Sequence, residues 1–117
     1  MKENPILEKS FAFALRVIKL CKYLNEDKRE FILSKELLIA GTNVGKHVKE
    51  AVNVESRQTF INEFAIARRK ASETEYWLQL MFQAELLTFA EYTSIEGDRV
   101  VIAKMLTSIV KTAKENV

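Results

Sequence analysis

The chain has 117 residues, which is enough for one domain and leaves little room for a second. Hydrophobic residues make up 48% of the sequence and charged residues 29%, which is ordinary for a globular domain. Three glycines and one proline are too few for the turns of a β-sandwich or an α/β fold. We therefore expect a single all-α domain over residues 1–117.

Charge and cysteine content restrict the function classes. The formal net charge is +2 and the pI is near 8.7, which is less basic than most dedicated nucleic-acid-binding domains. A single cysteine, Cys21, excludes an internal disulfide, and its helical context favours a buried thiol over a nucleophile. No leader-like segment and no apolar run of about 18 residues is present, so we expect a cytoplasmic protein with no membrane partner.

The first helix is expected to begin at Asn4 and Pro5, because asparagine caps helices and proline suits the first helical position. The polar residues from Asn25 to Asp27 should end it. Apolar residues recur every three or four positions between these ends, which predicts one buried stripe. That stripe consists of Leu7, Phe11, Leu15, Ile18 and Cys21.

A second helix is expected from about Lys28 to Val52. Its predicted buried stripe consists of Phe31, Ser34, Leu38, Gly41, Gly45, Val48 and Val52. An interior glycine costs a helix about 1 kcal/mol relative to alanine, so Gly41 and Gly45 favour close approach of another helix. A kink or break near residues 41–43 is the alternative to an unbroken helix.

The third helix is expected to start after Ser56, a suitable cap, and to reach about Ala84. Its predicted stripe consists of Phe60, Phe64, Ala67, Ala71, Thr74, Leu78 and Met81. Ile61, Trp77 and Phe82 widen this stripe beyond what one neighbouring helix covers. For Trp77 we favour packing in a core or a subunit interface over stacking on unpaired bases.

Thr88 and Glu91 have the spacing of a capping box and predict the start of a fourth helix, which should end near Lys114. Gly97 and Asp98 are a point where it could break. Its predicted buried face consists of Tyr92, Ile95, Ile102, Leu106, Ile109 and Ala113. Four helices joined by short connections predict an antiparallel up-down-up-down four-helix bundle.

Residue patterns that support catalysis are not found in the sequence. His47 and Cys21 do not make up the ligand set of a zinc site, and no Glu-x-x-His motif is present for a di-iron centre. Gly41, Gly45 and Lys46 do not have the spacing of a phosphate-binding loop. We therefore expect a protein that is not an enzyme, with no cofactor, no metal and no small-molecule substrate.

Basic residues gather in the middle of the second and third helices. Consecutive residues point in different directions on a helix, so Arg68, Arg69 and Lys70 cannot form one tight patch, and Arg69 is spaced for an ion pair with Glu73. The alternative to a phosphate-binding surface is a solvated outer face. If the two helices lie side by side with these faces outward, the candidate nucleic-acid-binding residues are Lys46, His47, Lys49, Arg68, Arg69 and Lys70.

Several strings in the sequence resemble one protein family over nearly the whole chain. The second helix carries Ser34-Lys35-Glu36-Leu37-Leu38 and then Gly41-Thr42-Asn43-Val44-Gly45, where the family has Gly-Thr-Ser-Ile-Gly. Further strings are Glu8-Lys9-Ser10-Phe11-Ala12-Phe13-Ala14, Glu73-Thr74-Glu75-Tyr76-Trp77-Leu78 and Leu106-Thr107-Ser108-Ile109-Val110-Lys111-Thr112. Together they resemble the four-helix-bundle proteins encoded in intervening sequences of bacterial 23S ribosomal RNA genes.

This resemblance implies a four-helix bundle that assembles as a homopentameric ring. A similar protein is the accessory variability determinant of diversity-generating retroelements, which works with a reverse transcriptase and nucleic acid. The resemblance therefore implies RNA or DNA as a partner, or another protein such as a polymerase. Lys46 and His47 stand where the family has Ala-Asn, and Lys49 stands for the first residue of its Glu-Glu pair, which makes this stretch more basic. The alternative function is a protein-interaction scaffold without nucleic-acid contact.

Overall fold

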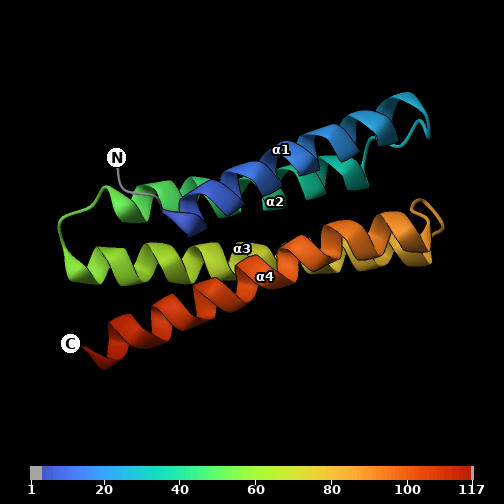
Figure 1. Cartoon of the computed structure of the whole chain (residues 1–117). Coiled ribbons are helices and arrows are strands. Elements are labelled where there is room, and N and C mark those ends of the chain that lie inside the picture. The colour runs from blue at the N-terminus through green and yellow to red at the C-terminus, as the bar shows by residue number, and fades with distance from the viewer. Residues whose placement is uncertain (1–3, 117) are drawn as a thin grey trace.

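The computed structural model describes residues 4–116 as four antiparallel helices, and these residues contain no strand (Figure 1). The helices are α1 (Pro5–Glu26), α2 (Leu33–Val52), α3 (Arg57–Gln83) and α4 (Phe89–Glu115). They form an elongated bundle of 47 × 24 × 23 Å. The predicted all-α four-helix bundle is therefore confirmed.

The helices pack in their chain order around one core. Each helix packs extensively on the next one, whereas α1 and α4 are in contact over a much smaller area of the bundle. The α1–α2 and α3–α4 connections lie at one end of the bundle, and the α2–α3 connection lies at the other end with both termini (Figure 1). The C-terminal half of α4 slopes away from α3 towards that second end (Figure 1). The bundle is consequently less closed there.

The start of α2 differs from the prediction. The helix begins at Leu33 rather than Lys28, because residues 27–32 form a connection in which Arg29 has a positive φ of 55°. The carboxylate of Glu30 accepts hydrogen bonds from the backbone N–H groups of Ile32, Leu33 and Ser34, at 2.8–3.1 Å. Glu30 thus satisfies donors that have no partner within the helix, and it replaces the usual cap.

The two glycines of α2 lie where α1 approaches closely, and the helix is unbroken through both. A Cβ atom on Gly41 would lie 2.7 Å from Val17 Cγ2, and one on Gly45 would lie 3.1 Å from the carbonyl oxygen of Ser10. The expected close helix contact is therefore confirmed. The kink near residue 41 does not occur.

The predicted stripe of α1 was wrong except for the buried Cys21 and the half-buried Leu7, whereas that of α2 was partly correct, because Ser34, Gly41 and Val48 are buried. Phe11, Leu15 and Ile18 are 66%, 46% and 46% exposed, whereas the buried residues of α1 are Ile6, Ser10, Phe13, Val17, Cys21 and Leu24. Phe31 and Leu38 are also exposed, and the buried residues of α2 are Ser34, Leu37, Ala40, Gly41, Val44, Val48 and Ala51. Both helices carry apolar residues on two adjacent faces, so periodicity alone could not identify the inner one.

The predictions for α3 and α4 were closer. Ser56 and Thr88 cap the two helices, Thr88 and Glu91 form the expected capping box, and α4 continues through Gly97. The α3 stripe was correct except that Phe60 is half-buried and Ile61 takes its place in the core. In α4, Arg99 and Val110 are buried where Tyr92 and Ile109 were expected. None of the helices described is long and apolar enough to cross a membrane.

Candidate nucleic-acid interface

The three candidate residues of α2 point in different directions. Lys46 is exposed and forms no ion pair within residues 4–116. His47 faces α3, where its Nδ1 lies 2.9 Å from Glu63 Oε2, and both side chains are about four-fifths buried. Lys49 is exposed and lines a hollow beside Phe11 and Gly45, between α1 and α2. The structure therefore does not bring Lys46, His47 and Lys49 together.

The basic run of α3 is also divided among faces. Lys70 is half-buried, and its Nζ lies 3.3 Å from Glu73 Oε1. This pair replaces the ion pair that was expected between Arg69 and Glu73. Arg68 is half-buried, whereas Arg69 is exposed, and neither forms an ion pair within the part of the chain that the structure describes. Lys46 and Arg69 are thus the best-exposed cations of the candidate set, together with Lys49.

A further basic surface, which the sequence analysis did not identify, lies on α4. Lys104 and Lys111 line a hollow of about 390 Å³ together with Thr107 and Ser108. Both lysines are exposed, and their spacing of seven residues places them on one side of the helix. Amino and hydroxyl groups in one row are suited to phosphate oxygens. The i,i+7 spacing of two lysines with hydroxyl residues between them was a signal available in the sequence.

Arg99 forms a buried ionic network at the α3–α4 contact. Its guanidinium bonds to both carboxylate oxygens of Glu96 at 2.7 Å and to Glu75 Oε2 at 2.8 Å, and only 7% of its side chain is exposed. The hydrogen bonds and charge of Glu96, with the charge of Glu75, raise the pKa of Arg99 despite its burial. Arg99 therefore stays charged, and its charge is balanced by Glu96 and Glu75 and is not available to a phosphate group.

The Cys21 thiol is enclosed in the core, and the side chains that could bind a metal ion are dispersed over the described residues. The thiol of Cys21 is buried and donates to the carbonyl oxygen of Ser34 at 3.2 Å. Burial, with a smaller effect of the Glu30 charge, raises the pKa of Cys21 to about 11. A thiol in this state is a poor nucleophile at neutral pH. Residues 4–116 contain no cluster of three or more His, Cys, Asp and Glu side chains placed to hold a metal ion.

An exposed apolar surface covers the outer side of α1 and the adjoining part of α2. We call it the α1–α2 apolar surface, and its residues are Phe11, Leu15 and Ile18 of α1 and Leu38 of α2, all between 36% and 66% exposed. Three of these residues, on α1, follow one another at helical spacing. A row of large exposed apolar side chains of this kind typically marks an interaction surface.

Comparison with known proteins identifies the family. The family model of the 23S rRNA-intervening sequence protein matches residues 2–108. The chain belongs to this family.

A solved structure supports the same relationship. The chain resembles the crystal structure of a protein with unknown function from the S23 ribosomal protein family of Bacteroides thetaiotaomicron, with 42% sequence identity and a TM-score of 0.89. The match covers 91% of this chain and 98% of the other. A comparison with curated proteins gave no match. The resemblance predicted from the residue strings is thus confirmed, and it extends to the arrangement of the helices.

Proposed function

We propose that this member of the 23S rRNA-intervening sequence protein family is a non-enzymatic, oligomeric protein that binds structured RNA through basic helix surfaces. The observation that carries the proposal is a set of exposed cations on its outer faces that have no ion-pair partner within residues 4–116. Lys46 on α2 and Arg69 on α3 are the principal residues, and Lys104 and Lys111 on α4 form a second row. Phosphate contacts of this kind give affinity with little sequence preference.

The proposed assembly is a homopentameric ring, which the family resemblance implies. The α1–α2 apolar surface supports self-association, because Phe11, Leu15 and Ile18 are large apolar side chains that a second copy would remove from water. A net charge of only +2 offers weak attraction to a polyanion for one chain. Rotational symmetry would repeat the same cations several times on one ring and so strengthen binding.

The test is a salt titration of binding to a structured ribosomal RNA fragment, with duplex DNA measured in parallel. For the wild-type protein, affinity should fall linearly in log salt between about 50 and 200 mM. The double variant Lys46→Glu/Arg69→Glu should bind more weakly and with a shallower slope, since fewer phosphates are neutralised. The double variant Lys104→Glu/Lys111→Glu measures the contribution of α4 in the same way.

A charge-matched control separates a local effect from a change in net charge. Lys9→Glu/Lys22→Glu alters two exposed lysines of α1 and changes the net charge equally. This control should retain more affinity than either of the other two variants. Absence of wild-type RNA binding at about 50 mM salt would reject the proposed function.

The α1–α2 apolar surface also favours a second candidate function, that of a protein-interaction scaffold. Its four apolar residues would then bind another protein, such as a polymerase, instead of a second copy of the chain. A pull-down after nuclease treatment distinguishes the two functions. Stoichiometric recovery of one protein partner, lost in Leu15→Glu, would support the scaffold.

A further inference from the structure

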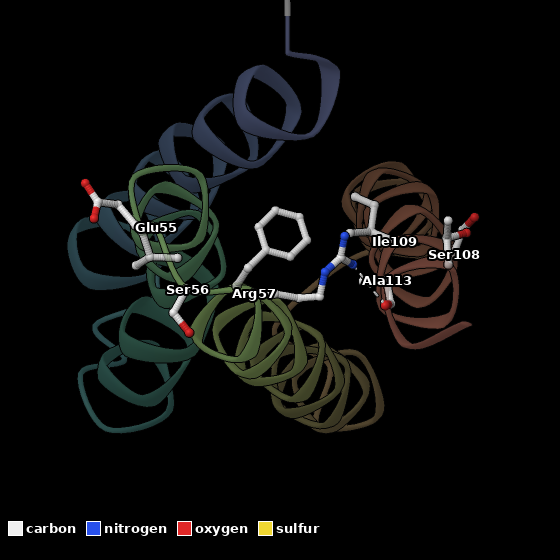
Figure 2. A pocket seen from close by; sticks show the side chains of 9 residues that line it. Glu55, Ser56, Arg57, Ser108, Ile109 and Ala113 are labelled. Carbon is white, nitrogen blue, oxygen red and sulfur yellow. Dashed lines mark hydrogen bonds between the residues drawn. The ribbon is translucent and has the colours of Figure 1, made fainter. Parts of the chain in front are cut away.

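A cleft lies at the less closed end of the bundle, between the start of α3 and the end of α4. Its volume is about 600 Å³, and its lining residues are Val54, Glu55, Ser56, Arg57, Phe60, Ser108, Ile109, Thr112 and Ala113. Figure 2 shows this end of the bundle and the side chains around the cleft. The volume is within the range of roughly 300–1,000 Å³ that is typical of sites for small ligands.

The cleft lies where the C-terminal half of α4 diverges from α3 (Figure 1). Arg16 of α1 reaches Ser94 and Asp98 of α4, which holds these helices together nearer to the other end. Beyond that point α4 slopes away from α3 (Figure 1). Phe60 and Ile109, which line the cleft, are only half-buried. Both side chains pack against the edge of the core, so the floor of the cleft is apolar and continuous with the interior.

Arg57 gives this apolar cleft a positive charge at its edge. Its side chain extends from α3 towards Ile109 and Ala113 on α4, whereas the carboxylate of Glu55 points away from them (Figure 2). The Arg57 guanidinium donates one hydrogen bond, of 3.3 Å, to the carbonyl oxygen of Ala113, and within residues 4–116 it has no carboxylate partner. Several of its five N–H donors therefore remain available.

We infer that this cleft binds a small amphiphile, namely a molecule with an apolar chain and one carboxylate. The apolar chain lies against Phe60 and Ile109, and the carboxylate accepts hydrogen bonds from the Arg57 guanidinium. Arginine suits this role because its planar donors match a carboxylate in two-point geometry. The ligand is bound and not transformed, and the inference does not depend on RNA binding, because Arg57 is outside the proposed RNA-binding residues.

The experiment uses decanoate, with decanol and octanoate as comparison ligands, and follows backbone amide resonances by NMR. Decanoate should shift resonances of residues 54–60 and 108–113 saturably, at concentrations up to about 5 mM. Octanoate should bind several-fold more weakly, because burial of each methylene contributes up to about fourfold in affinity. Decanol should bind about tenfold more weakly than decanoate, since it lacks the charge that Arg57 recognises.

Two variants test the two halves of the cleft. Arg57→Met retains an apolar stem without the charge, and it should remove the preference for decanoate over decanol. Thr112→Phe fills the cleft from an exposed position, and it should weaken both ligands. Lys22→Met, which removes one charge from an exposed site on α1, should bind decanoate like the wild type. Circular dichroism verifies that each variant is folded.

Four outcomes would overturn the inference. The first is an absence of saturable decanoate binding, and the second is a set of shifts confined to the α1–α2 apolar surface. The third is an unchanged preference for decanoate in Arg57→Met. Unchanged affinity for both ligands in a folded Thr112→Phe variant would also overturn it.

Discussion

Arg99 occupies a core position of α4 between Ile95 and Ile102, although arginine is rarely buried. It remains charged there because Glu96 and Glu75 provide two carboxylates, and the carbonyl oxygen of Ala71 lies 3.5 Å from its Nη1. The network connects α4 with α3 through one side chain.

Substitution Arg99→Met should destabilise the protein by about 3 kcal/mol, because Glu96 would lose its partner while only 15% exposed. Glu75→Gln should cost less than about 1 kcal/mol, since Glu75 is 40% exposed and water solvates it. Urea unfolding of both variants measures the difference. A larger loss in Glu75→Gln than in Arg99→Met would contradict this account of the network.

Glu30 acts at the residue scale as the cap of α2. Burial disfavours its charged form, but hydrogen bonds from the backbone N–H groups of Leu33, Ser34 and Ile32 and from the Ser34 hydroxyl outweigh burial and lower the pKa of Glu30. Because its folded pKa lies below the unfolded value of about 4.3, Glu30 stabilises the fold fully above that pH. The contribution is lost as the pH falls through the folded pKa.

We expect Glu30→Ala to lower the free energy of unfolding by about 1 kcal/mol at pH 7, as loss of a helix cap usually does. The difference from the wild type should shrink below about pH 4. Unfolding curves at several pH values measure it. A difference that stays constant from neutral to strongly acidic pH would show that the Glu30 charge has no role in capping.

At the scale of helices, Gly41 and Gly45 allow α1 and α2 to approach closely. Their cost in helix propensity is compensated by contacts that any larger residue would prevent. Val17 is completely buried, so it cannot move away from a Cβ atom at position 41. Gly97 of α4 is different, because a Cβ atom there would have no neighbour within 4 Å.

Substitution by alanine should therefore have opposite effects on stability at Gly41 and at Gly97. Gly97→Ala should stabilise the protein by about 0.5–1 kcal/mol through helix propensity alone. Gly41→Ala should destabilise it by about 1–2 kcal/mol, since overpacking against Val17 exceeds the same gain in propensity. Thermal unfolding measures both variants, and Val17→Ala in the Gly41→Ala background should recover part of the loss. Stabilisation by Gly41→Ala alone would disprove the steric argument.

At the scale of the whole molecule, the distribution of apolar residues is uneven. The α1–α2 apolar surface gathers several large exposed apolar side chains, which typically marks an interaction surface. If it is the contact between copies in the proposed ring, its disruption should change the assembly and leave the fold of one chain intact.

Leu15→Glu should therefore convert the oligomer into a monomer, which light scattering after size-exclusion chromatography detects by mass. Val101→Glu is a matched control on α4, because Val101 is 47% exposed and Leu15 is 46% exposed. The control should retain the wild-type mass. A wild-type protein with the mass of one chain, 13.5 kDa, would reject the proposed ring.

The sequence by itself determined the number of helices, most of their ends and the family. Caps at Asn4, Ser56 and Thr88 are local signals that depend on side chains and backbone only a few residues apart. The buried stripe of α3 was equally clear, because its residues recur every three or four positions. The exception was α2, whose start depends on Glu30 reaching forward from an irregular connection.

The tertiary structure alone decided which apolar face of α1 and α2 is inside. Both faces of α1 have helical periodicity, and the packing of Val17 on Gly41 and of Ser10 on Gly45 accompanies burial of the face with Phe13 rather than the one with Phe11. The contacts of His47 with Glu63 and of Arg99 with Glu75 were likewise decided by helix packing, since each joins two different helices. Helix formation is a local property of the chain, whereas the choice of an inner face depends on all four helices at once.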